Sequence, residues 1–257
     1  MRKFILALLF FLTLCQCHKP EKIVPRSLPK GGSHLLLRVM YLVTGEKYGL
    51  LHLAGDEHLE EGLRTEKTIV NMRDPRDVMI SMVNFSDKRI AEGLERGKPF
   101  PAFKPLDSYE PWMRLTFEEK LTAVITLDDR LIPFWGESIR KNFDCLRKLV
   151  EEKRENILFV KFENLVGEKG GGDAQSQQCE IARIAQFARV HLSQERLDTI
   201  AQEAWGIGRE WDVHEVTFSK GTIGRWHGSY TPEQIKLFKA HWNQYLLVWG
   251  YETSEDW

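Results

Sequence analysis

Three short apolar runs, each followed by a turn and a helical pattern, constrain the fold of this chain more than any other feature. The runs cover residues 22–27, 68–72 and 156–162. Strands that alternate with helices predict a parallel sheet, because a parallel crossover needs a long connection that a helix usually supplies. The 257 residues suffice for one large core and contain no internal repeat or domain-sized linker. We therefore expect one α/β domain over residues 22–257, with a parallel sheet flanked by helices.

The expected helices follow from apolar residues at helical spacing. They cover residues 33–43, a helix that begins at Pro75, and residues 117–131, 137–152, 175–204 and 232–247. Pro75 suits the first turn of its helix, where a missing N–H costs no hydrogen bond. Residues 86–116 are rich in proline, glycine and charge, and are expected to form a long excursion over the surface. Residues 167–173 are expected to form a flexible turn.

Composition excludes several classes of protein. The net charge is −1, from 36 basic and 37 acidic residues, so the chain lacks the overall positive field that attracts nucleic acid. Anion recognition therefore has to be local. The four cysteines are too scattered for a zinc site or a disulfide framework. We expect neither a metal nor a nucleic-acid partner.

The first residues have the pattern of a secretory signal peptide. Met-Arg-Lys precedes the apolar run FILALLFFLTL, which is followed by the polar sequence CQCHKPEK. Eleven apolar residues fall short of the roughly 20 that span a bilayer as a helix. We predict that residues 1–21 form a hydrophobic leader. Export or membrane association through residues 1–17 is favoured over a cytoplasmic location, with no other membrane contact. The alternative is a buried N-terminal helix or a hydrophobic extension of the domain.

The sequence PKGGSHL, residues 29–35, lies between the first strand and the first helix. In a strand–loop–helix unit of this kind, glycines let backbone N–H groups and the helix N-terminus converge on a phosphate. Lys30 adds a mobile positive charge and Ser33 a hydroxyl donor. The segment is not a Walker A loop, because its lysine precedes the glycines. Taken alone, it is equally well explained as a Gly-Gly turn with a solvated lysine.

A second segment, RDPRDVMISMVNF, follows the strand at residues 68–72. It places Arg73 and Ser81 near the carboxyl end of that strand, where ligands bind in open α/β sheets. Arginine offers a planar fork of donors that suits phosphate. The alternative is a structural ion pair of Arg73 with Asp74 or Asp77. A third segment, KGTIGRW at residues 220–226, is by itself an ordinary glycine-punctuated basic loop.

Together and in this order, the three segments resemble those of sulfotransferases that use 3′-phosphoadenosine 5′-phosphosulfate (PAPS). PKGGSHL is similar to the 5′-phosphosulfate loop of that family, RDPRDVMISMVNF to its 3′-phosphate segment, and KGTIGRW to its late Lys-Gly-x-x-Gly-x-Trp loop. The sequence FVKFENL also resembles a Tyr/Phe-Glu-Asp-Leu stretch between them. The resemblance implies a P-loop-like nucleotide-binding fold. It also implies transfer of a sulfuryl group to a hydroxyl, or amine, of an acceptor that is a small molecule.

The resemblance assigns roles to individual residues. Those on the 5′ side are Lys30, Gly31, Gly32, Ser33 and His34, with Lys30 on the bridging and leaving phosphate oxygens. Those on the 3′-phosphate are Arg73, Ser81, Lys220 and the backbone of Gly221, and Phe162 is placed near the adenine. The chain departs from the family pattern at His34, which replaces a threonine, at Leu35, which replaces a stacking tryptophan, and at Ser219, which replaces an arginine.

Catalysis also needs a base to remove the proton of the attacking hydroxyl, a task that suits histidine near neutral pH. The family places a His-Leu pair about twenty residues before the 3′-phosphate arginine. His52-Leu53 stands 21 residues before Arg73, so His52 is our candidate. His58 and Glu57 are rivals, and a hydrogen-bonded structural histidine at a strand end is the alternative.

The acceptor and the competing functions stay open at this point. Aromatic residues in the expected surface excursion either roof an apolar acceptor pocket or pack locally; they are Phe100, Phe103, Tyr109 and Trp112. One competing function is a non-catalytic exported lipoprotein on a degenerate sulfotransferase scaffold, which the departures at His34, Leu35 and Ser219 favour. Another is a P-loop kinase, although the order of Lys30 and the glycines argues against it.

Overall fold

A computed structural model describes residues 23–49, 51–53, 59–99, 105–205 and 221–257. The predicted leader, residues 1–21, lies outside this range. So do several residues that the sequence singled out: Glu57, His58, Phe100, Phe103, Ser219 and Lys220. In the described part of the chain, no helix is both long enough and apolar enough to cross a membrane.

Within the described residues, four parallel strands form one sheet in the order β2-β1-β3-β4. Their bounds are β1 Ile23–Ser27, β2 Leu51–His52, β3 Lys67–Met72 and β4 Ile157–Lys161. Each is joined to its neighbour by a crossover, so all carboxyl ends meet at one edge of the sheet. The predicted α/β fold with a parallel sheet is confirmed, and the short strand β2 is an addition to the three predicted strands.

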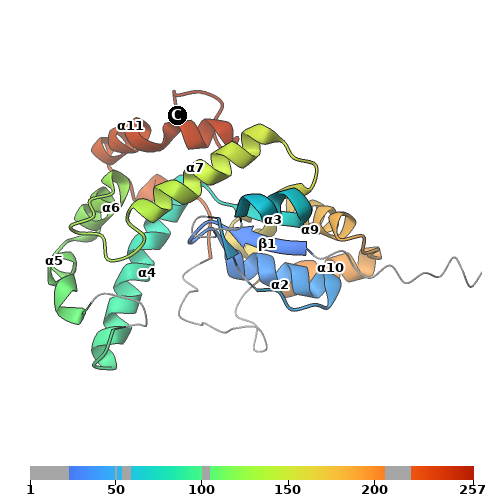
Figure 1. Ribbon diagram of the computed structural model, residues 1–257, viewed down its shortest axis with the longest axis horizontal. Helices are drawn as coiled ribbons and strands as arrows, with labels where there is room; N and C mark the ends of the chain where they lie inside the picture. The colour runs from blue at the N-terminus through green and yellow to red at the C-terminus, as the bar shows by residue number, and fades with distance from the viewer. Residues whose placement is uncertain (1–22, 50, 54–58, 100–104, 206–220) are drawn as a thin grey trace, which may run out of the picture.

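Helices cover both faces of this sheet, as Figure 1 shows for β1, which lies between α2 on one side and α3 and α7 on the other. The α-helices are α2 Ser33–Thr44, α3 Leu59–Thr65, α4 Pro75–Glu95, α5 Glu110–Met113, α6 Phe117–Thr126, α7 Glu137–Glu152, α8 Phe162–Leu165, α9 Ala174–Phe187, α10 Gln194–Ala204 and α11 Pro232–Val248. The described residues also contain the 3₁₀ helices η1 Leu106–Tyr109, η2 Glu168–Gly170 and η4 Arg225–Gly228.

The strands separate two hydrophobic cores, because successive side chains of a strand point to opposite faces. In β3, Val70 and Met72 contribute to the core under α3, α4, α6, α7 and α11. Ile69, the residue before Val70, contributes to the core under α2, α9 and α10. Leu35, at the position where the family has a stacking tryptophan, packs against this second core. The sheet is therefore buried on both faces, which explains why its strands read as continuous apolar runs.

The prediction of a long surface excursion over residues 86–116 is wrong. Helix α4 continues to Glu95, because Ser86, Arg89, Ile90 and Gly93 form a buried stripe at helical spacing. The later aromatics are also part of the core: Tyr109 is 3% exposed and Trp112 is 1% exposed. These two residues pack within the first hydrophobic core, and a place beside the acceptor stays a prediction.

Two further boundaries differ from the prediction. Helix α6 stops at Thr126, since Leu127 adopts a left-handed conformation with φ 54°. Residues 167–173 do not form a flexible turn but a tightly packed one that contains η2. A Cβ atom on Gly170 would lie 2.1 Å from Val166 Cγ2 and 2.9 Å from the carbonyl oxygen of Gly221. The glycine is needed there so that the loop after residue 220 can pack against this turn.

Candidate active site at the carboxyl edge of the sheet

The PKGGSHL segment forms a tight turn from β1 into α2. Lys30 and Gly32 both have positive φ, 61° and 91°, and Gly32 is the N-cap of α2. A Cβ atom on Gly32 would lie 2.2 Å from Phe162 Cδ2, so glycine is required for both conformation and space. Asn71 of β3 donates a hydrogen bond of 2.7 Å to the carbonyl oxygen of Gly31. The neighbouring strand thus fixes the turn that opens α2.

The N-terminus of α2 is suited to binding an anion. Ser33 is its first residue and is buried, while His34 is exposed. The first turn carries no acidic residue, and no side chain caps it. The amide dipoles of α2 therefore present the partial positive charge that favours negative ligands.

Lys30 stands among other positive charges. Its Nζ lies 4.3 Å from the ring centroid of Phe85 on α4. Burial lowers the pKa of Lys30 from its ordinary 10.5 to about 7, and the charges of Arg73, Arg89 and Lys88 act in the same direction. Several positive charges thus lie close to the turn that opens α2, and such a local positive field favours a negative ligand.

Arg73 joins the other two motif segments. It follows β3, is 6% exposed, and donates hydrogen bonds to the carbonyl oxygens of Lys30 (3.3 Å) and Thr222 (3.1 Å). Its guanidinium lies over the Phe162 ring, 4.4 Å from the centroid. Its Nε is buried and has no hydrogen-bond partner among the described residues. A buried donor in this state is typical of a site that is completed by a ligand or water.

Asp77, in the first turn of α4, holds the late loop. It is 1% exposed, and its carboxylate accepts hydrogen bonds from the backbone N–H groups of Gly224 (2.8 Å) and Trp226 (3.2 Å). Burial raises the pKa of Asp77, although the Arg73 charge and these two bonds oppose the rise. Asp77 is thus engaged with backbone, and Asp74 is bonded to Arg76. These contacts differ from the Arg73 ion pair that the sequence left open.

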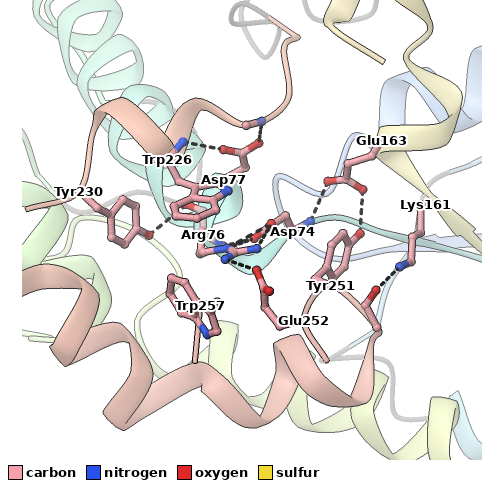
Figure 2. A network of polar contacts seen from close by, with 12 residues as sticks. Asp74, Arg76, Asp77, Lys161, Glu163, Trp226, Tyr230, Tyr251, Glu252 and Trp257 are labelled. Atoms are coloured by element: carbon pink, nitrogen blue, oxygen red, sulfur yellow. Dashed lines mark hydrogen bonds and ion pairs between the residues drawn. The ribbon is translucent and has the colours of Figure 1, made fainter. Parts of the chain in front are cut away.

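A network of polar contacts lies behind this loop (Figure 2). The guanidinium of Arg76 is bonded to Asp74 (2.7 Å) and Glu252 (2.6 Å). Glu163, which follows β4, accepts from the backbone N–H of Asp74 (2.9 Å) and from the hydroxyl of Tyr251 (2.7 Å). Sequence reasoning missed this network, and the Glu in FVKFENL was its only available signal. Its groups satisfy one another, so it supports the turn at residues 73–77 from outside the site.

His52 lies at the end of β2, directly beside Ser27 of β1 in the sheet register. Its Nδ1 is 3.1 Å from the carbonyl oxygen of Ser27. Because a carbonyl oxygen only accepts, Nδ1 carries the hydrogen in this bond, and a neutral ring then has its lone pair on Nε2. The His52 side chain is exposed. It lies at the same sheet edge as the PKGGSHL turn, since Ser27 and Lys30 are three residues apart.

Comparison with known proteins supplies the family. A family model described as "Sulfotransferase domain" matches residues 52–250, more than half of the chain. The chain belongs to the sulfotransferase family. The crystal structure of mouse sulfotransferase SULT7A1 complexed with PAP is similar in fold, with a TM-score of 0.58 and 16% sequence identity over 88% of this chain and 84% of that chain. No curated protein sequence matched the chain.

The structure of this sulfotransferase brings most of the predicted site residues together. Lys30, Gly31, Gly32, Ser33 and His34 form one turn, and Arg73 connects it to the loop that begins at Gly221. Ser81 is buried on α4, one turn before Phe85, whose ring lies under Lys30. Phe162 is 4% exposed and packs against Gly32 and Arg73. Its place near an adenine stays a prediction. Among the described residues, no three His, Cys, Asp or Glu side chains are grouped as a metal site requires.

Proposed function

We propose that this sulfotransferase moves a sulfuryl group from PAPS to a hydroxyl, or amine, of a small acceptor. One observation carries the proposal: Arg73 is hydrogen-bonded to the Lys30 turn and to the Thr222 loop, and its buried Nε has no hydrogen-bond partner among the described residues. A guanidinium held in this way is suited to a phosphate that lies between the two loops. The three segments that resemble the family's donor-binding motifs are therefore neighbours in space as well as in order.

The residues present fit a nucleotide that carries phosphate groups at both ends of its ribose. The turn at residues 30–34 supplies a lysine, a left-handed glycine and the N-terminus of α2 for the 5′ group. Arg73, Ser81 and the Gly221 backbone are assigned to the 3′-phosphate. Lys220, which lies outside the described residues, stays a predicted contact of the same group. PAPS supplies the activated sulfuryl group when bound, and the protein provides position and charge.

Lys30 and His52 have different roles in the transfer step. Lys30 neutralises the charge that develops on the phosphate oxygen as the bond from sulfur to that oxygen breaks. His52 Nε2 accepts the proton of the attacking hydroxyl while the hydroxyl oxygen bonds to sulfur. The hydrogen bond of Nδ1 to Ser27 fixes the ring in the tautomer that this step needs. The Nε2 lone pair of His52 can thus accept a proton, and the positive charge of Lys30 is stabilised when an anion binds beside it. Sulfuryl transfer needs both of these functions.

Aromatic side chains beside Lys30 favour an acceptor with an apolar body. The Phe85 ring lies 4.8 Å from that of Trp135 and 5.9 Å from that of Phe134. Because Lys30 also contacts Phe85, these rings border the place where the sulfuryl group would be transferred. Apolar walls with a few polar groups are typical of small-molecule sites.

The test measures donor-site binding and turnover separately. Titration calorimetry of the full chain with adenosine 3′,5′-bisphosphate, the desulfated product, should give micromolar affinity that ATP does not match. His52→Ala should retain this binding and lower the rate of sulfuryl transfer to a phenolic acceptor by about 10²- to 10⁴-fold. The exposed His191→Ala is the matched control and should change neither quantity. Equal binding of both nucleotides, or no binding, would contradict the proposed function.

A further inference from the structure

Asn71 is a polar residue in a place that suits an apolar side chain. It is the fifth residue of β3 and is 0% exposed. In the sheet register it lies beside Ser27 of β1 and Val160 of β4, and Val160 belongs to the second hydrophobic core. A buried polar group costs stability unless it is hydrogen-bonded. The partners of the Asn71 amide therefore indicate why an asparagine stands here.

The described residues satisfy one half of this amide. Its Nδ2 donates a hydrogen bond of 2.7 Å to the carbonyl oxygen of Gly31. The bond assigns the two amide atoms, because a carbonyl oxygen can only accept. The other atom, Oδ1, is buried and has no hydrogen-bond partner among the described residues. A leucine has a similar shape and no open acceptor, so the bond to Gly31 is what favours asparagine.

The peptide between Gly31 and Gly32 is the group that this bond controls. In a trans peptide the carbonyl and the following N–H point in opposite directions. The Gly31 carbonyl faces Asn71, so the N–H of Gly32 faces away from β3, at the N-terminus of α2. Glycine on both sides lets such a peptide rotate at low cost. After half a turn, a carbonyl oxygen would stand where the N–H now stands.

Two neighbouring carbonyls of the same turn are also bonded. Arg73 donates to the carbonyl oxygen of Lys30 at 3.3 Å, and the N–H of Gly31 donates to that of Leu28 at 2.9 Å. Carbonyl oxygens carry partial negative charge and repel an anion, whereas the N–H groups at the start of a helix attract one. The bond from Asn71 to Gly31 therefore favours the orientation of the turn that can hold an anion.

We infer that Asn71 is a positioning residue: it prevents rotation of the Gly31–Gly32 peptide and so keeps the Gly32 N–H directed at the 5′ phosphate group of the bound nucleotide. The inference rests on the proposed function for the identity of this group. Asn71 stands outside the three segments that carry the family resemblance, so the resemblance assigns it no role. It acts through the turn, which it holds from the side of the sheet.

The test compares two nucleotides that differ in the 5′ phosphate, by titration calorimetry of the full chain. Asn71→Leu keeps the approximate shape of the side chain and loses the bond to Gly31. It should weaken binding of adenosine 3′,5′-bisphosphate by about 10-fold, because an N–H contact to a charged group is lost. Binding of adenosine 3′-phosphate should be unchanged. The Tm without nucleotide should stay close to that of the wild type, since the variant also removes the open Oδ1 acceptor.

Two further variants guard against a trivial explanation. Asn71→Ala cannot clash with its surroundings and should show the same selective loss. Thr68→Val is the matched control, because Thr68 is also a buried residue of β3 whose Oγ1 has no hydrogen-bond partner among the described residues. It lies three residues before Asn71, toward the opposite edge of the sheet. This variant should bind both nucleotides as the wild type does.

Other outcomes decide against the inference. If the Asn71 variants weaken both nucleotides equally, or weaken neither, Asn71 does not position the Gly32 N–H for the 5′ group. If neither variant folds, Asn71 is a structural residue and the inference is wrong.

A wild type that binds neither nucleotide would instead contradict the proposed function, and inorganic phosphate then decides on Asn71. A rise in Tm with phosphate that persists in Thr68→Val and disappears in Asn71→Leu supports the positioning role. The absence of a rise in the wild type, or an equal rise in all three proteins, overturns it.

Discussion

Arg73 and Arg76 stand three residues apart at the start of the same helix, are almost equally buried, and have opposite surroundings. Arg76 is bonded through its guanidinium to two carboxylates, Asp74 and Glu252. Arg73 contacts backbone carbonyls and an aromatic ring, and has a buried donor without a partner among the described residues. The guanidinium of Arg76 is thus bonded directly to carboxylates. The charge of Arg73 acts on Asp77 and Glu163 without such a bond, and its Nε keeps a buried donor without a partner among the described residues.

The aromatic contacts sharpen the difference. The Arg76 guanidinium lies 3.8 Å from the Trp226 ring centroid and 4.5 Å from that of Trp257, so it is enclosed on both sides as well as paired (Figure 2). A cavity of about 480 Å³ adjoins it, lined in part by Trp226, Trp257 and Glu252. The comparison teaches that residue type and burial do not separate a structural arginine from a binding one. The partners of the guanidinium do.

The largest expected effect tests this contrast with a matched pair of variants. Arg76→Met leaves two carboxylates without their cation, and should lower the free energy of unfolding by about 3–5 kcal/mol. Arg73→Met removes bonds to two carbonyls and should lower it by about 1–2 kcal/mol. It should also abolish the rise in Tm that adenosine 3′,5′-bisphosphate produces in the wild type. Urea denaturation with and without the nucleotide measures both quantities.

The contrast would be wrong if the two variants exchanged their effects. A folded Arg76→Met protein that has normal stability and no longer binds the nucleotide would place Arg76 in the binding site. An Arg73→Met protein with an undiminished nucleotide response would remove Arg73 from it.

Lys30 lies in the same site as Arg73, and its pKa gives the contrast a pH dependence. Because its folded pKa of about 7 lies below the ordinary 10.5, the unfolded chain binds more protons between these values. Stability then rises with pH over that window. The charged lysine costs most at pH 7 and below, and the cost fades as pH approaches 10.5.

Lys30→Met should therefore stabilise the protein while it abolishes turnover. We expect a gain of about 2 kcal/mol at pH 7, less than the full pKa difference implies because the ammonium keeps some contact with solvent. The gain should shrink toward zero near pH 10. Denaturation curves of both proteins from pH 6 to pH 10 measure it. A loss of stability, or a gain that does not depend on pH, would contradict the account of Lys30 as a cation whose charge is disfavoured by burial.

Much of the candidate site around Lys30 and Arg73 could be predicted from the sequence, because its residues lie in short contiguous segments. The turn at Gly31-Gly32 and the strand that ends before Arg73 are local features, set by glycine conformation and by apolar runs. Their order along the chain carried the family resemblance. The proline at position 75 also marked the start of α4 correctly.

The polar network around Arg76 and Glu163 could not be predicted, since its contacts join distant parts of the chain. Arg76 and Glu252 are 176 residues apart, and Asp74 and Glu163 are 89 apart. No periodicity records such pairings. The length of α4 was misjudged for a related reason. The charge-rich residues after Phe85 hid an inward stripe that only packing against Tyr109 and Trp112 makes evident.

The smallest expected effect tests one hydrogen bond of the polar network around Arg76 and Glu163. Glu163 accepts hydrogen bonds from the Tyr251 hydroxyl at 2.7 Å and from the Asp74 backbone N–H at 2.9 Å. Burial raises the pKa of Glu163, and these two bonds oppose the rise. Tyr251→Phe removes the first bond and keeps the ring, and should lower the free energy of unfolding by about 1 kcal/mol. Nucleotide affinity should be unchanged, because the second bond still holds the turn that begins at Arg73. Tyr230→Phe, which removes a hydroxyl bonded to the Arg76 carbonyl, is the matched control within the same network. If Tyr251→Phe weakens nucleotide binding while stability is retained, the polar network takes part in nucleotide binding. The distinction between a binding role for Arg73 and a structural role for Arg76 would then be wrong.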